Sequence, residues 1–336
     1  MKSTIQDVAK KAGVSTTTVS RVMNNNYPVK KETRIKVESA IKKLNFRPNI
    51  LARGLIHKKS NTIGVIVPSI TNLFFPTVVK AIEAILREQG YFIYLCNTDN
   101  KEDEEIGYIN SLQDRQVDGI IVIDPQTKNM KSGLYEKISK EIPLVFINGY
   151  NKDVNCNFVI NDEESGAIEA MRYLIKSGHK KIAFIRGQKS YSYDLKEIVY
   201  KNVLNDSVYK KIINIGEGNK DSTVDHTMEI IQRFLLTENR PSAFFCCNDL
   251  MALGVINACK KIGLDVPEDM SIIGFDNIIT SRLVEPKLTT VDQNMYDLGV
   301  NAAKMLLKNI ENENVDIQRK ILTPQLIIRQ STKKIS

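Results

Sequence analysis

Between residues 61 and 277, short apolar runs alternate with longer segments whose apolar residues recur at helical spacing. Continuous apolar runs of this length are typical of strands buried on both faces, so the alternation predicts parallel sheets covered by helices. Strands are expected at 62–68, 91–96, 119–123, 143–148, 181–187, 210–215, 243–249 and 271–277. Helices are expected at about 75–89, 102–116, from 124 to 140, 163–177, 222–236 and 250–262.

The pattern restarts after Asp162, which predicts two α/β lobes in tandem with a cleft between them. Ligands of open α/β sheets bind beyond the carboxyl ends of the strands. Residues that directly follow the predicted strands are therefore the candidates for lining a small-molecule site in this cleft.

Residues 4–24, TIQDVAKKAGVSTTTVSRVMN, have the pattern of two short helices joined by a glycine turn. Thr4 and Asp7 have the spacing of a capping box, Gly13 ends the first helix, and Ser15 is placed to begin the second. This is the pattern of a helix-turn-helix, which lays its second helix in the DNA major groove. A small helical bundle without a ligand is the alternative.

Charge favours the DNA-binding interpretation. Residues 1–59 contain 14 Lys and Arg against three acidic residues, a net charge of +11. The other 277 residues contain 33 basic and 36 acidic residues, a net charge of −3. A basic head on a near-neutral body indicates a nucleic-acid-binding module attached to a domain with another role.

A third helix is expected at about 31–44, which completes an all-α head at 1–46. The segment RPNILARGL at 47–55 could form only about one and a half helical turns. An isolated helix becomes marginal in water only at ~12 residues or more, so this segment should fold only when something holds it. We therefore treat 47–60 as a hinge.

The blocks DVAKKAGVSTTTVSRVMN and TRIKVESAIKKLNFRPNILARGL closely resemble the head and hinge of the LacI/GalR family of bacterial transcription regulators, including its catabolite-control and ribose-repressor-like members. In that family two hinge helices enter the minor groove, and a leucine, matched here by Leu55, opens a base step. Unstacking wedges are a known minor-groove device; the alternative is that Leu55 begins the next core. The candidates for DNA binding are Thr4, Ser15, Thr16, Thr17, Thr18, Ser20, Arg21, Asn24, Arg34, Asn49, Ala52, Arg53 and Leu55.

The segments NLFFP, NDLMALGV, IIGFDN and LTTVDQNMYDLG resemble the effector-binding core of the same family, which is similar to periplasmic sugar-binding proteins. The resemblance implies a core at 61–336 made of an N-subdomain (about 61–160 plus 293–320) and a C-subdomain (about 161–292 plus 321–330). Carboxylates, amides and an aromatic face suit a polyhydroxylated ring. The candidates for effector binding are Phe75, Asp124, Arg186, Asn248, Asp276 and Gln293. For Asn248 the alternative is a helix cap.

Two segments depart from the usual pattern. Residues 187–206 lack the arginine that grips the effector in many relatives, and Tyr191, Tyr193 or Lys196 could replace it. Residues 295–307, MYDLGVNAAKMLL, resemble the segment by which catabolite-control regulators bind a serine-phosphorylated phosphocarrier protein. Tyr296, Asp297 and Lys304 would form that surface, although Lys304 stands where an arginine is usual, and lysine lacks its planar fork.

Other chemistry is poorly supported by the sequence. The three histidines are scattered without a catalytic or metal-binding spacing, so no enzyme, cofactor or metal site is expected. The five cysteines read as reduced core residues. The chain shows no signal peptide and no apolar run long enough to span a bilayer, which predicts a cytoplasmic protein. Without terminal leucine heptads, we expect a two-fold homodimer on a palindromic operator, with a sugar or sugar phosphate as effector.

Overall fold

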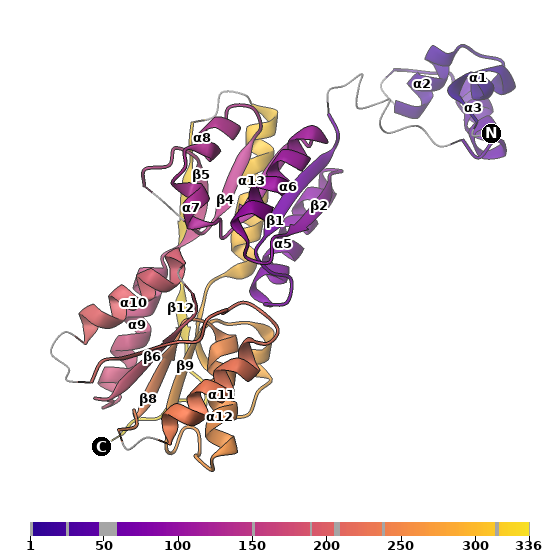
Figure 1. Ribbon diagram of the computed structural model, residues 1–336. Helices are drawn as coiled ribbons and strands as arrows, with labels where there is room; N and C mark the ends of the chain where they lie inside the picture. The colour runs from indigo at the N-terminus through magenta and orange to yellow at the C-terminus, as the bar shows by residue number, and fades with distance from the viewer. Residues whose placement is uncertain are drawn as a thin grey trace. The chain divides into compact units, whose positions relative to one another are not determined.

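The computed structural model describes residues 3–24, 27–46, 59–149, 152–188, 190–204, 209–236, 239–312 and 316–335. The chain divides into two compact units, residues 1–60 and residues 61–336, which are described separately (Figure 1). In the part of the chain that the structure describes, no helix is long and apolar enough to cross a membrane.

The described residues of the first unit form the three helices α1 (Ile5–Ala12), α2 (Thr16–Asn24) and α3 (Lys31–Lys43). Thr4 and Asp7 form the predicted capping box at the start of α1, and Gly13 ends this helix with a φ of 69°, a conformation that glycine adopts without strain. Val8, Val19 and Val37 contribute one buried side chain from each helix to the shared core. The predicted helix-turn-helix is therefore present as α1 and α2.

The second unit begins with a lobe built on a six-stranded parallel sheet of described residues, in the order β11-β5-β4-β3-β1-β2. Alternate strand residues enter two cores, one beneath α5 and α13 and one beneath α6, α7 and α8. The strands are β1 (Thr62–Val67), β2 (Phe92–Asn97), β3 (Gly119–Ile123), β4 (Leu144–Ile147), β5 (Asn157–Asn161) and β11 (Arg319–Leu322), and the helices are α5 (Phe74–Glu88), α6 (Glu102–Asp114), α7 (Thr127–Met130), α8 (Leu134–Ile138) and α13 (Met295–Glu311).

The second lobe is built on another six-stranded sheet of described residues, in the order β12-β10-β9-β8-β6-β7, in which only the β10–β12 pair is antiparallel. Its strands are β6 (Ile182–Arg186), β7 (Lys211–Asn214), β8 (Ala243–Cys246), β9 (Ser271–Asp276), β10 (Thr289–Asp292) and β12 (Gln325–Ile327), and its helices are α9 (Glu163–Lys176), α10 (Tyr191–Val203), α11 (Thr223–Leu235), α12 (Asp249–Lys261) and the 3-10 helix η1 (Ile279–Arg282).

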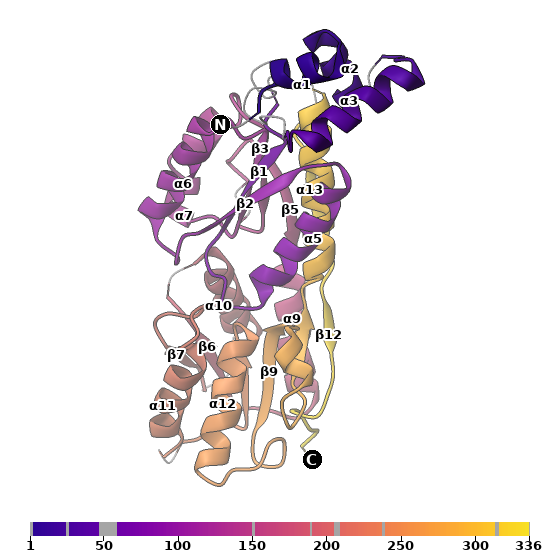
Figure 2. The same cartoon turned by 90° about the vertical axis from the view of Figure 1, so that its right-hand side faces the viewer.

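In the part of the chain that the structure describes, three segments connect the two sheets. The chain leaves the first sheet after β5, returns after β10 through α13 to β11, and crosses again to β12. Figure 2 shows α13 running beside α5, with the β12 segment descending into the second lobe. Because β11 pairs with β5 as far as Leu322, the first sheet extends slightly beyond the boundary expected at residue 320.

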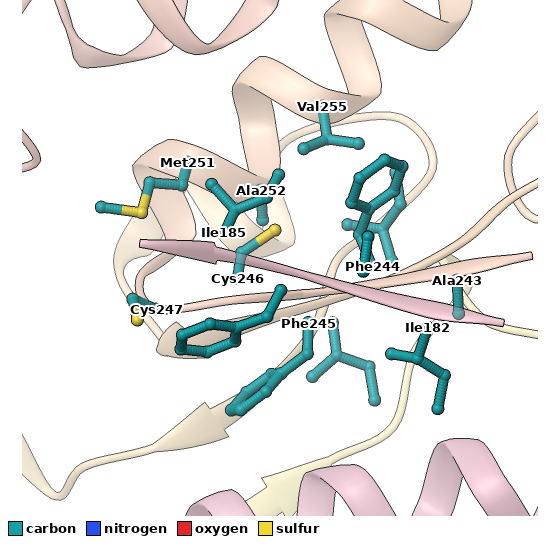
Figure 3. Packing of buried hydrophobic residues seen from close by; sticks show 14 of the residues in the cluster. Ile182, Ile185, Ala243, Phe244, Phe245, Cys246, Cys247, Met251, Ala252 and Val255 are labelled. Atoms are coloured by element: carbon teal, nitrogen blue, oxygen red, sulfur yellow. The ribbon is translucent and has the colours of Figure 1, made fainter. Parts of the chain in front are cut away.

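The core of the second lobe accounts for the cysteine pair at 246–247. Cys246 and Cys247 are fully buried at the end of β8 among phenylalanine and aliphatic side chains, as Figure 3 shows. All five cysteines are free thiols, and all but the half-buried Cys96 are buried. They serve as small apolar core residues, as the sequence indicated.

One local prediction is wrong, and one helix was not predicted. The helix expected to run from 124 to 140 is divided into α7 and α8, because Gly133 lies between them with a φ of 73° and starts a new helix. The segment after 187, to which no helix was assigned, forms the 13-residue helix α10. Ser190 caps it by accepting a hydrogen bond from the Tyr193 amide.

Candidate functional site

The outward face of α2 presents the residues expected to read DNA. Thr16, Thr17 and Arg21 are exposed, and the Arg21 guanidinium lies 5.0 Å from the centre of the Tyr27 ring. Ser15 Oγ lies 3.0 Å from Thr18 Oγ1 and accepts a hydrogen bond from the Thr18 amide, which begins the helix. Small hydroxyls and one arginine on an exposed helix are suited to contact base edges and phosphates.

The other candidates in the head have structural partners, and those in the hinge lie outside the described residues. Asn24 Nδ2 donates to Ser20 Oγ at 3.4 Å. The Arg34 guanidinium donates to the carbonyl oxygen of Val22 at 3.5 Å and thereby connects α3 to α2. Thr4 caps α1. The hinge candidates Asn49, Ala52, Arg53 and Leu55 lie outside the described residues.

A cavity of about 460 Å³ lies between the two lobes of the second unit. This volume is within the ~300–1,000 Å³ of typical small-molecule sites. Five of the six predicted effector residues line it, namely Phe75, Asp124, Asn248, Asp276 and Gln293. Tyr191, Tyr193 and Lys196, the three candidates to replace the missing arginine, line it as well.

Arg186 is the predicted effector residue that does not line this cavity. It ends β6, and its guanidinium donates to the carboxylates of Asp194, at 2.6 Å, and Glu197. Its Nε also donates to the carbonyl oxygen of Gly187 at 3.1 Å. Because Asp194 and Glu197 lie one helical turn apart on α10, the arginine fixes this helix to the end of β6.

Lys196 supplies a buried cation at the cavity instead. It lies on α10 and is only 1 % exposed, with its Nζ 3.3 Å from Glu163 Oε2, 2.8 Å from Ser192 Oγ and 3.9 Å from the centre of the Phe275 ring. Burial is the largest single effect and opposes the charged form, but the surrounding negative groups, led by Glu163 and including Asp276, together raise the pKa of Lys196. The ammonium therefore remains charged and is held by a carboxylate, a hydroxyl and an aromatic face.

Asp276 and Gln293 form a hydrogen-bonded pair in the cavity wall. Gln293 Nε2 donates to Asp276 Oδ1 at 2.6 Å, while Gln293 Oε1 is buried and receives no hydrogen bond from any described residue. Asp276 has a φ of 113°, a strained backbone conformation of the kind that concentrates at functional sites. Burial also raises the pKa of Asp276, and it raises that of Asp124 to about 7.

Asn248 does act as a helix cap, as the alternative interpretation proposed. Its Oδ1 accepts a hydrogen bond from the Met251 amide at the start of α12, and its Nδ2 donates to the Gly218 carbonyl oxygen at 2.8 Å. Its neighbour Asp249 is also structural, since its carboxylate accepts hydrogen bonds from the Ile278 amide and from Thr290 Oγ1. Asn248 still lines the cavity, so capping and ligand contact are compatible.

Asn219 is a cavity residue that the sequence analysis did not identify. Its carbonyl oxygen accepts from Ser69 Oγ and its Oδ1 accepts from Asn72 Nδ2, both at 2.8 Å. Tyr193 Oη also donates to Asn219 Oδ1 at 3.3 Å. Ser69 and Asn72 belong to the first lobe and Asn219 to a loop of the second, so these bonds join the lobes. In the sequence, the only sign of this contact was its other partner, Asn72, which begins the NLFFP segment.

The segment expected to meet a protein corepressor forms the first three turns of α13. Tyr296, Asp297 and Lys304 are all exposed, and their spacing of seven to eight residues places them near one face of the helix. The intervening Leu298, Gly299, Ala302 and Ala303 are buried against the first lobe.

An all-α helix-turn-helix head followed by a two-lobed α/β core around a polar cavity defines a ligand-binding transcription regulator. Residues 4–49 match the model for bacterial regulatory proteins of the lacI family, and residues 171–332 match a periplasmic binding protein-like domain. The chain belongs to the LacI family.

Three relatives illustrate this membership. Catabolite control protein A of Priestia megaterium is 40% identical, covering 99% of this chain and 100% of that protein. The ribose operon repressor of Halalkalibacterium halodurans is 35% identical, covering 98% and 97%. The crystal structure of the lac repressor dimer bound to operator and the anti-inducer ONPF has a TM-score of 0.85 at 27% identity, covering 99% and 100%.

These similarities confirm the family and the fold class predicted from the sequence, an all-α head with a periplasmic-binding-protein-like core. The two protein relatives bear the names of transcription regulators rather than enzymes, in agreement with the exclusion of catalysis from the residue pattern.

Proposed function

We propose that the chain is a cytoplasmic, homodimeric repressor of carbohydrate-metabolism genes that binds a palindromic operator and responds to a small polyhydroxylated effector in the inter-lobe cavity. The observation that carries the proposal is the cavity itself. Residues of both lobes line it, and their carboxylate, amide and aromatic groups are suited to a sugar ring.

DNA binding is assigned to the head. The exposed face of α2 carries Thr16, Thr17 and Arg21, and residues 1–59 carry a net charge of +11. Phosphate neutralisation by such a head releases counterions, so operator affinity should fall steeply with salt. We further propose that 47–60 acts as a hinge in which Leu55 wedges a base step, and that 61–336 is the effector-binding core.

Two exposed apolar surfaces support a homodimer. On the edge strand β2, Phe92 is 74 % exposed, and Tyr94 and Leu95 are about half exposed. On the second lobe, Ile279 and Leu283 in and after η1 are exposed. Apolar patches and an uncovered edge strand are surfaces that a second copy would bury.

Effector control would act through the arrangement of the lobes. The hydrogen bonds from Ser69 and Asn72 to Asn219 join the lobes beside the cavity, so a ligand there can favour one arrangement over another. A ligand changes operator affinity only through its different affinity for the two arrangements. We infer that binding in the cavity biases how the two heads and hinges are presented to DNA.

The experiment is a footprint of the purified full chain on genomic DNA, with and without a panel of sugars. Protection of discrete palindromic sites, altered by at least one panel member, is the expected result. Arg21→Ala should lose protection, while Lys260→Ala, at the exposed end of α12, should retain it. A chain that protects no site would instead be a small-molecule carrier whose head is vestigial.

A phosphorylated phosphocarrier protein is the second candidate effector. The exposure of Tyr296, Asp297 and Lys304 on α13 favours it, as does the relative named catabolite control protein A. If this protein is the corepressor, its serine-phosphorylated form should tighten operator binding and Lys304→Glu should abolish the effect. If operator affinity is the same with and without the phosphorylated protein, the small-molecule effector is the only remaining candidate.

A further inference from the structure

The acidic side chains that line the cavity outnumber the basic ones. Four acidic side chains (Glu102, Asp124, Glu163 and Asp276) and three lysines (Lys128, Lys131 and Lys196) line the cavity, and the ammonium of Lys196 is already bound by Glu163 and Ser192. Asp124 and Asp276 make no ion pair within 4.0 Å with any residue that the structure describes. The cavity therefore presents two carboxyl groups that form no ion pair at contact distance, and the charge of Lys196 only partly offsets the effect of burial on their pKa.

The lysines at the cavity mouth do not correct this imbalance. Lys128 Nζ is bound to Glu102 Oε2 at 2.7 Å and is largely exposed. Lys131 is also exposed. Exposed charges are screened by water and salt, whereas the buried Asp276 and the partly buried Asp124 act on a ligand through a medium of lower polarity.

The uncharged polar side chains next to Asp276 also present hydrogen-bond acceptors to the cavity. Gln293 Nε2 donates to Asp276, which fixes the orientation of the amide and leaves Gln293 Oε1 as a buried acceptor without a described donor. Asn248 Nδ2 is already used by Gly218. Gln293 Oε1 and the oxygens of Asp124 and Asp276 therefore form a group of acceptors, and hydrogen-bond donors on a ligand would complement them.

A metal ion does not account for this arrangement. Across the described ranges, no group of three or more His, Cys, Asp or Glu side chains has a geometry that could hold a metal ion. An organic ammonium meets the requirement differently, because its three N–H bonds can be shared between separate carboxylates and an amide oxygen. Burial raises the pKa of Asp124 and of Asp276, and a bound cation would offset that cost.

We propose that the cavity selects a polyhydroxylated ligand that carries a protonated amine, of the amino-sugar class, and discriminates against sugar phosphates. The ammonium would lie between Asp124 and Asp276, with ring hydroxyls donating to Gln293 Oε1. This inference rests on the proposed function, since it narrows the chemical class of the effector. A phosphate at the same place would face two carboxylates, while Lys196, the buried lysine of the cavity lining, is held by Glu163.

The test is calorimetry and thermal shift on the full chain at pH 7. The probes are glucosamine, galactosamine and mannosamine, each with its parent hexose, its N-acetyl derivative and its hexose 6-phosphate. At least one amine-bearing sugar should bind tenfold or more tightly than its parent and N-acetyl forms, and the 6-phosphates should bind more weakly than the parents. A tightest ligand that is neutral or phosphorylated overturns the inference, as does a panel in which no amine-bearing sugar raises the midpoint.

Two variants test the origin of the selectivity. Asp124→Asn should reduce the preference for the amine over the parent sugar at least fivefold, whereas Asp225→Asn, on the exposed face of α11, should not. Glu163→Gln would release Lys196 and should raise hexose 6-phosphate affinity at least fivefold. If Glu163→Gln fails to fold, the Asp124→Asn variant alone tests the proposal. Unchanged selectivity for the amine in Asp124→Asn contradicts the proposal.

Failure of this inference is distinguishable from failure of the proposed function. If the footprint responds to a neutral sugar while no amine-bearing sugar binds, the charge argument is wrong and the regulator remains. If no DNA site is protected under any condition, the proposed function itself is wrong.

Discussion

Asn72 Nδ2 donates a hydrogen bond to Asn219 Oδ1 at 2.8 Å and thereby joins the first lobe to the second beside the cavity. Asn72 also holds its own loop, because its Oδ1 accepts from the Phe74 amide at 3.1 Å at the start of α5. The helix that carries Phe75 to the cavity and the contact between the lobes therefore share one side chain. If a ligand contacts Phe75 as proposed, it will act on the same segment that joins the two lobes.

Removal of the Asn219 side chain should loosen this junction. Asn219→Ala deletes the acceptor for Asn72 and Tyr193, so backbone amides at 69–72 and 217–220 should exchange hydrogen faster by threefold or more. Hydrogen exchange with mass spectrometry measures this. Asn301→Ala, which removes only a bond to the Asp297 carbonyl within α13, is the control. Equal exchange in both variants would show that the contact does not hold the lobes.

Asp124→Asn should stabilise the protein at high pH. Burial raises the pKa of Asp124 from 3.8 to about 7, so at pH 8 the folded state carries a charge that is less favourable there than in the unfolded chain. As the pH falls from about 7 to about 4, the folded state takes up a proton before the unfolded state does, and wild-type stability rises.

The variant should therefore gain on the order of 2 kcal/mol at pH 8 and much less at pH 4. Asparagine tolerates the φ of 48° at this position, so backbone strain does not obscure the comparison. Chemical denaturation at the two pH values gives the result. A gain that is the same at both pH values would contradict the assigned cause.

Gly299 should be required for the packing of α13 on α5. A Cβ at this glycine would lie 2.8 Å from Ala81 Cβ and closer still to the Val78 carbonyl oxygen. Gly299→Ala must push the helices apart and should cost ~1–3 kcal/mol. Gly107 in α6 is exposed with open space around it, so Gly107→Ala should instead stabilise by ~0.5–1 kcal/mol. Urea unfolding of both variants tests this, and equal signs would refute it.

The capping box should stabilise the head. Thr4→Ala leaves the Asp7 amide without its side-chain acceptor and should destabilise the start of α1 by about 1 kcal/mol. Faster exchange of the first-turn amides of α1 in the full chain would report the loss. Thr17→Ala, at an exposed position of α2 without a capping role, should leave those amides unchanged. Unaltered exchange in Thr4→Ala would remove the cap from the account.

Local periodicity was sufficient to predict most strands and helices, because the buried runs of β1, β3 and β8 are continuous and the flanking helices are amphipathic. Periodicity did not predict the role of a side chain whose binding partner is distant in the sequence. Arg186 follows the pattern of a strand-end ligand residue, yet Asp194 and Glu197 on α10 bind it. The role of Asn219 depends on the opposite lobe, which no sequence spacing reveals.

The candidate site was predictable to the extent that strand ends meet at one sheet edge. Asp276 ends β9 and Gln293 follows β10, and these strands are parallel neighbours, so the two side chains come together as topology requires. The state of Lys196 was not predictable, because its partner Glu163 begins a different helix. Charge balance in the cavity therefore becomes visible only in three dimensions.

Selection of binding sites from random duplex DNA by the purified full chain, followed by sequencing, tests the central claim most directly. Enrichment of a two-fold-symmetric sequence, lost in Arg21→Ala and with an affinity that falls steeply with salt, is the predicted result. Recovery of no sequence above the random background, with every sugar of the panel and with none, would contradict the account.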